Sequence, residues 1–168
     1  MFLDAPGRTV RIVAITALAV LVGLPGTGSA TTGRFVWPLD PRPVVTRHFD
    51  PPEHDWLPGH RGVDLEARSG RTVAAAGDGI VVFAGLVAGK PVVSIDHPGG
   101  LRTTYEPVDA TVTAGRRVAR GEPIGTVVAG HEGCAAPACL HWGLRRDRDD
   151  YLDPLPLVQR PVIRLHPV

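Results

Sequence analysis

Residues 72–84 read TVAAAGDGIVVFA, and this pattern of short apolar runs separated by turn residues recurs along the chain. Two short apolar runs, residues 72–76 and 80–84, flank the pair Asp78-Gly79. Asp-Gly between apolar runs is a strong signal for a hairpin or a tight turn. Short runs rich in apolar and β-branched residues and bounded by turn residues are typical of strands. This stretch therefore predicts two strands joined by a turn.

Further short runs of the same kind lie on both sides of it. We expect strands at residues 44–46, 91–95, 101–105, 112–115, 117–118, 124–128 and 140–145. In the last run, Leu140, Trp142 and Leu144 face one side of the strand and His141 faces the other. Several short strands at regular spacing predict an all-β fold, an antiparallel sandwich or a barrel-like arrangement.

Composition narrows the class of protein. The chain has 168 residues, of which 43% are hydrophobic and 21% charged, and its formal net charge is +1. This length corresponds to one domain of ordinary size with small extras. The low, balanced charge argues against a disordered chain and supplies no basic footprint for nucleic acid. We therefore expect one globular domain with no nucleic-acid partner.

The first thirty residues have the layout of a secretory signal peptide. Arg8 and Arg11 precede an apolar run at 12–24, and small residues at 28–30 follow a Pro-Gly break. A run of about 13 residues is shorter than the roughly 18–20 that a membrane-spanning helix needs. We expect cleavage near Ala30 and a secreted, extracytoplasmic chain without a stable membrane anchor. The alternative is an uncleaved N-terminal anchor.

The two cysteines suit an oxidising compartment. Cys134 and Cys139 are separated by four residues. A single pair of this spacing is weak support for zinc, since structural zinc sites usually need two pairs. We therefore favour a disulfide between them, on the grounds of the compartment.

Two histidines and one aspartate are candidate metal ligands. His60 and Asp64 stand in one short segment, and His141 stands in a late strand. Imidazole and carboxylate groups are suitable zinc ligands. On an ideal strand His60 and Asp64 are about 13 Å apart, so the segment must bend, and Gly62 would permit it. The alternative is that Asp64 caps a turn and His141 fills a half-buried strand position.

Several motifs, taken in order, resemble those of the lysostaphin/LytM-type zinc peptidases of bacterial peptidoglycan. They are His60-x-Gly62-x-Asp64 and the segments 70–85, 95–100, 112–125 and 140–145. The resemblance covers residues 46–157. We therefore divide the chain into a signal peptide at 1–30, a Pro-rich lead-in at 31–45, a metallopeptidase-like domain at 46–157 and a C-terminal tail at 158–168.

The resemblance implies a fold, a cofactor and a substrate class. The implied fold is a duplicated hybrid motif with a central groove and irregular terminal extensions. The implied cofactor is one Zn²⁺ held by His60, Asp64 and His141, with an open position for water. The implied activity is that of a cell-wall metalloendopeptidase, a hydrolase of peptide bonds in peptidoglycan.

Two positions depart from the family pattern. The family usually has His-x-His in the last motif, and Cys139 stands in place of its first histidine. The family also has a histidine in a Tyr-x-His-Leu stretch, where this chain has Pro107. Glu106 and His131 are weak stand-in candidates for these catalytic groups. His97 is another, although we interpret it as a turn residue.

Two other functions remain open. A catalytically impaired member of the family would serve as a wall-binding module or as an activator of another cell-wall hydrolase. The segment 115–125 also looks like a biotinyl or lipoyl carrier domain, in which Lys90 would be the modified lysine. Lys90 lacks the flanking methionines of such domains, and a secreted chain would escape the cytoplasmic ligase.

Overall fold

The structure is a computed structural model that describes residues 34–159, except for 55, 132 and 135. The expected signal peptide and the end of the expected C-terminal tail lie outside the described residues. Among the residues described, no helix has the length and apolar character required to cross a membrane.

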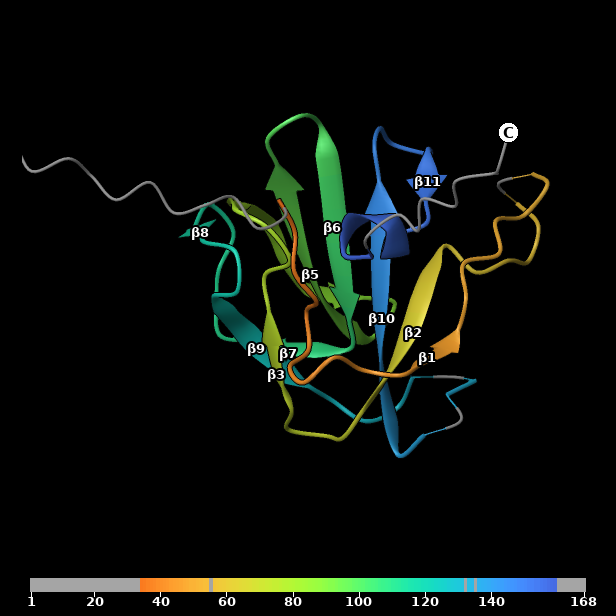
Figure 1. The fold of residues 1–168 in the computed structure, drawn as a ribbon, viewed down its shortest axis with the longest axis horizontal. Coiled ribbons are helices and arrows are strands. Elements are labelled where there is room, and N and C mark those ends of the chain that lie inside the picture. The colour runs from red at the N-terminus through yellow and green to blue at the C-terminus, as the bar shows by residue number, and fades with distance from the viewer. Residues whose placement is uncertain (1–33, 55, 132, 135, 160–168) are drawn as a thin grey trace, which may run out of the picture. The chain divides into compact units, whose positions relative to one another are not determined.

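The described elements are strands, apart from one short 3-10 helix at Leu155–Leu157 (Figure 1). The strands are β1 (Val45–Arg47), β2 (Gly62–Ala67), β3 (Thr72–Ala74), β4 (Gly79–Val87), β5 (Lys90–His97), β6 (Leu101–Glu106), β7 (Val108–Ala110), β8 (Arg117–Val118), β9 (Pro123–Val127), β10 (Ala138–Arg145) and β11 (Tyr151–Leu152). The predicted all-β, antiparallel class is confirmed, but the sheets do not close into a barrel.

The strands form two antiparallel sheets. The larger follows the order β1-β2-β10-β6-β5-β4-β8, with β11 paired to β10, and the smaller follows β3-β9-β7. Buried side chains from both sheets make one core, including Val63, Leu140 and Trp142 from the larger and Val73 and Ile124 from the smaller. Burial of this shared apolar surface is the main source of stability in such a fold.

The predicted turn at Asp78-Gly79 does not join a hairpin. β3 pairs with β9, whereas β4 pairs with β5 and β8, so the chain passes from one sheet to the other at this point. The expected strand at 112–115 is also wrong, because β7 forms at Val108–Ala110 instead. Short apolar runs mark buried strands but do not say which strands pair.

The centre of the large sheet aligns three side chains in one row. Asp64 on β2 is paired with His141 on β10, and His141 is paired with Glu106 on β6. Side chains directly opposite one another point to the same face of a sheet. The alternate residues of these strands, such as Leu65, Trp142 and Tyr105, are fully buried in the core. The opposite face of the core sheet therefore carries the polar row.

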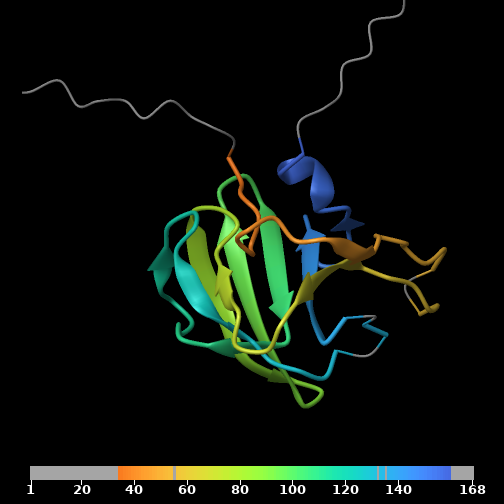
Figure 2. The same ribbon diagram turned by 60° about the horizontal axis from the view of Figure 1, so that its bottom comes forward.

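Two connections approach this row from the same side of the sheet. One is the segment 50–60 before β2, and the other joins β9 to β10. Figures 1 and 2 both show them beside the β1, β2 and β10 end of the sheet. Each connection brings a histidine to the polar row.

Candidate metal centre

His60 is fixed just outside β2 by main-chain hydrogen bonds. Its backbone forms an isolated bridge with Asp50, and both N–H to O bonds of that bridge are present. The chain turns between this bridge and the start of β2 at Gly62. His60 Nε2 consequently lies 3.0 Å from Asp64 Oδ1, although four residues of straight strand would separate them by about 13 Å.

Gly62 serves this geometry by its lack of a side chain. We expected the conformational freedom of Gly62 to permit the bend, but the backbone of Gly62 is not in the left-handed region, so the bend does not depend on that freedom. A Cβ there would lie 2.6 Å from the Trp142 carbonyl oxygen and 2.7 Å from His141 Nε2. Glycine therefore allows β2 to pass close to the His141 imidazole.

His141 reaches the same point from β10. Its Nδ1 lies 3.0 Å from Asp64 Oδ1 and 3.1 Å from His60 Nε2. Direct pairing of His141 with Asp64 across the β2–β10 ladder sets this position. The three ligand candidates from the sequence are therefore brought together.

A fourth group joins them from the connection between β9 and β10. His131 Nε2 lies 3.0 Å from Asp64 Oδ1, and its side chain is only 10% exposed. One donor atom each from His60, Asp64, His131 and His141 lies within 4.8 Å of the other three. The sequence offered His131 only as a weak catalytic stand-in, since no spacing rule relates a loop histidine to a distant strand.

The protonation of His60 leaves a lone pair facing the cluster. Its Nδ1 is 2.7 Å from the backbone oxygen of His48, and because a carbonyl only accepts, Nδ1 carries the proton. In a neutral ring Nε2 is then an acceptor, pointed at a carboxylate oxygen and at another imidazole nitrogen. Acceptors at such distances repel one another unless a cation or a shared proton lies between them.

Asp64 is suited to a positive partner. Burial opposes its ionisation, but close contacts with His131 and His141 outweigh that effect and hold its pKa below the usual range. Its second oxygen, Oδ2, is buried without a hydrogen-bond partner. An ionised carboxylate with an unused oxygen, beside imidazole nitrogens, is a donor set that fits zinc.

The other candidate residues lie outside the cluster. Cys134 and Cys139 form a disulfide with an S–S distance of 2.03 Å. Glu106 stands opposite His141 on β6, and its carboxylate lies 3.6 Å from Lys90 Nζ. His97 ends β5 as a buried residue and not as a turn residue; its Nδ1 is 2.9 Å from the Asp78 oxygen.

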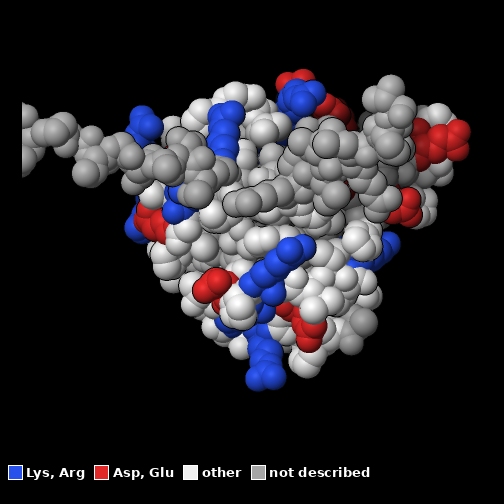
Figure 3. Space-filling model, in the orientation of Figure 1, with Lys and Arg blue, Asp and Glu red and all other residues white. Residues whose placement is uncertain are grey.

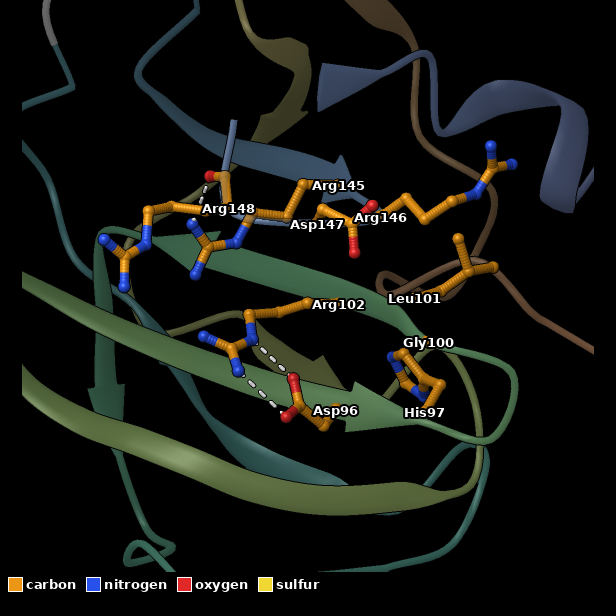
Figure 4. Close-up of a pocket in the computed structure, with 9 residues that line it drawn as sticks. All are labelled: Asp96, His97, Gly100, Leu101, Arg102, Arg145, Arg146, Asp147 and Arg148. Carbon is orange, nitrogen blue, oxygen red and sulfur yellow. Dashed lines mark hydrogen bonds and ion pairs between the residues drawn. The ribbon is translucent and has the colours of Figure 1, made fainter. Parts of the chain in front are cut away.

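A pocket of about 390 Å³ lies where β6 and β10 reach their other ends. Arg102, Asp96 and Arg145 are among its lining residues (Figure 4). Asp96 receives two hydrogen bonds from Arg102, while Arg145 donates to the backbone oxygen of Arg148 at 2.9 Å. On the face in Figure 3, basic and acidic side chains occur in small mixed groups.

Comparison with known proteins places these residues in a family context. The family model described as Peptidase family M23 matches residues 58–154, which include all four members of the cluster. An uncharacterized protein of Mycobacterium tuberculosis is 54% identical over 142 residues, which cover 83% of this chain and 57% of that protein. The chain thus spans little more than half the length of the curated relatives it matches.

Solved structures show the same fold. A zinc-containing peptidase from Vibrio cholerae is 26% identical, with a TM-score of 0.56 over 66% of this chain and 36% of that one. Lysostaphin from Staphylococcus simulans, an antimicrobial peptidase, is 24% identical, with a TM-score of 0.63 over 76% of this chain and 54% of that one.

Proposed function

Because the chain belongs to peptidase family M23, we propose that it binds zinc and hydrolyses peptide bonds of bacterial peptidoglycan. The zinc ligands in this proposal are His60, Asp64 and His141. The chemistry that zinc supplies in such a site is polarisation of a scissile carbonyl and activation of water. The chain's residues hold the ion, and β2 and β10 fix their relative positions.

One observation carries the zinc assignment. Three donor atoms, two from the adjacent strands β2 and β10 and one from His60 just before β2, converge at 3.0–3.1 Å, and the His60 lone pair faces the other two. The hydrogen bond from His60 Nδ1 to a backbone oxygen is the usual way in which a metal-bound imidazole is oriented. A merely structural histidine would show a donor to Asp64 there, which the His48 contact excludes for a neutral ring.

The site of action is also part of the proposal. Residues 1–30 would export the chain, and action outside the cytoplasm agrees with a disulfide between Cys134 and Cys139. The peptidoglycan substrate rests on the family resemblance. Lysostaphin, which shares the fold, is described as an antimicrobial peptidase.

Two measurements on the purified chain test the proposal. Metal analysis should find about one zinc per chain in the wild type and much less in His141→Ala, because loss of a metal ligand removes binding energy. Incubation with purified peptidoglycan should release soluble peptide fragments, and Asp64→Ala should release none. A wild-type protein free of zinc after purification in zinc-containing buffer would contradict the assignment.

A second candidate function is a non-catalytic wall-binding or hydrolase-activating module. It is favoured by the residues at the two helper positions, since Cys139 is fully buried in a disulfide and Pro107 has no group that transfers protons. A missing proton-transfer group or oxyanion donor typically costs about 10²–10⁴ in rate. Zinc-loaded protein that binds peptidoglycan in a pull-down but releases no fragments would establish this function.

A further inference from the structure

We propose that His131 is a fourth protein ligand of the metal, so that the centre is closed by three imidazoles and one carboxylate. The inference rests on the proposed zinc site and adds a ligand that the three-residue pattern does not include. It concerns whether a position on the metal remains free for water or substrate.

The first argument is distance. Four ligand atoms about 2.1 Å from one ion at tetrahedral corners lie about 3.4 Å from one another. His131 Nε2 is 3.0 Å from Asp64 Oδ1, the same distance as His60 Nε2 and His141 Nδ1. A group that only holds a water in the fourth position stands one hydrogen bond, about 2.8 Å, farther out. His131 Nε2 is thus at ligand distance from Asp64 Oδ1, and the four donor atoms lie within 4.8 Å of one another, which supports counting His131 among the ligands.

The second argument is the lack of other partners. Both ring nitrogens of His131 are buried; Nε2 contacts Asp64 Oδ1 at 3.0 Å, and Nδ1 has no hydrogen-bond partner within the described part of the chain. Leaving a buried polar group unsatisfied costs about 1–3 kcal/mol. A metal ion beside Asp64 Oδ1 satisfies Nε2 directly.

The third argument is the way the chain is tethered. The disulfide joins Cys134, three residues after His131, to Cys139, two residues before His141. Cys139 is fully buried, and its Sγ also contacts Thr46 Oγ1 at 3.6 Å. The cross-link thus holds the segment that carries His131 against the strand that carries His141. Such support is what a metal ligand on a connecting segment requires.

Closure has a chemical consequence. Structural zinc sites have four protein ligands, whereas catalytic sites keep one position open. With His131 bound, the metal has no position for water, so hydrolysis would require His131 to be displaced. In a closed centre the helper histidines would have no use, which agrees with the presence of Cys139 and Pro107 at those positions.

The experiment compares the wild type with His131→Ala and with His54→Ala as a matched control. His54 is exposed, stacks on Trp56 with ring centroids 4.8 Å apart, and is not a member of the cluster. Zinc affinity is measured by chelator competition, and X-ray absorption counts the imidazoles on the bound zinc. Cobalt-substituted protein is then titrated with acetohydroxamate, a small chelating anion that shifts the visible spectrum when it binds the metal.

We expect three imidazoles in the wild type and in His54→Ala, and two in His131→Ala. Zinc affinity should fall more than 100-fold in His131→Ala, beyond the roughly 10–100-fold typical of a group that only supports a ligand. Acetohydroxamate should shift the cobalt spectrum of His131→Ala and leave that of the wild type unchanged.

Each contrary result is distinct. Two imidazoles in the wild type, or an unchanged count in His131→Ala, would overturn the fourth-ligand assignment and leave the three-ligand zinc site intact. A wild-type protein that binds no zinc would instead overturn the proposed function on which this inference rests. A fall in affinity without a change in imidazole count would show that His131 only supports the other ligands.

Discussion

Gly62 and Gly143 are paired across β2 and β10, two residues along the strands from the paired Asp64 and His141 of the candidate metal site. The two glycines differ in what a methyl group would meet. At Gly62 a Cβ would strike the Trp142 backbone oxygen and the His141 ring, while at Gly143 it would meet the Thr104 hydroxyl, which can rotate away. The pair separates the effect of general crowding from displacement of a ligand.

We therefore expect Gly62→Ala to disturb zinc binding more than Gly143→Ala does. Overpacking of this kind typically costs about 1–3 kcal/mol of stability, and at Gly62 part of that cost moves the His141 imidazole. Denaturant unfolding and chelator competition on both variants give the comparison. Equal zinc affinities in the two variants would contradict the role given to Gly62.

His97 is the second residue-scale feature, and it is independent of the metal. Burial lowers the pKa of this imidazole, which lies between the Asp78 backbone oxygen and the Thr103 hydroxyl at 2.9 and 2.7 Å. Because the unfolded state then binds a proton more readily, the contribution of His97 to stability is present at neutral pH. It is lost as pH falls below about 6.5.

His97→Gln should flatten the pH dependence of stability on the acid side. The change should not exceed about 1.4 kcal/mol per pH unit, the limit for one proton. Denaturant unfolding of both proteins between pH 7.5 and 5 measures it, and taking the difference cancels the titration of the cluster. Parallel curves for the two proteins would show that His97 does not titrate on unfolding.

At the scale of elements, the connection between β9 and β10 is the part of the structure that the sequence predicted least well. The strand β10 and the faces of its side chains could be predicted, because side chains on a strand alternate between its two faces. The position of His131 could not be predicted, because a connecting segment has no such periodicity. The position of this segment also depends on the disulfide. For the segment before β2, the sequence predicted only that the chain must bend. The main-chain bridge between His60 and Asp50 fixes that bend.

Because the disulfide holds the segment that carries His131, the effects on zinc affinity of removing the disulfide and of removing His131 should not be additive. The Cys134→Ser, Cys139→Ser double variant should lose about 2 kcal/mol of stability from the opened short loop. Its zinc affinity should fall as well, toward that of His131→Ala. In the His131→Ala background, removal of the disulfide should leave zinc affinity unchanged, since the tethered ligand is already absent. Additive losses would show that the disulfide acts through other ligands.

At the scale of the whole molecule, the core and the cluster occupy opposite faces of the same strands. The short apolar runs in the sequence predicted most of the core strands, but the strand expected at 112–115 is absent. β2 and β7 were not predicted, because Asp64 and Glu66 interrupt one run and Val108–Ala110 is very short. Partition into two sheets could not be predicted, since Asp78-Gly79 connects sheets and not hairpin strands. The three ligand candidates came from their residue types and from the family resemblance, and the pairing of β2 with β10 explains why Asp64 and His141 lie together.

This separation predicts that the fold survives loss of metal. Core residues such as Val63, Leu140 and Trp142 are fully buried irrespective of the cluster. Chelation should therefore lower the unfolding temperature but retain the β-sheet circular dichroism at 25 °C. Zinc should add about 4 kcal/mol at a free concentration 1,000 times Kd. Unfolding on chelation at 25 °C would contradict this independence.

The carbonyl of residue 48 has a wider meaning for how this centre tolerates change. The proton of His60 is held by a peptide oxygen, so the ring keeps its orientation whatever side chain stands at position 48. The side chain at position 48 can therefore vary without loss of this hydrogen bond. A comparison of side-chain identities would not identify residue 48 as a supporting residue. What must be inherited is the path of the main chain past the ring.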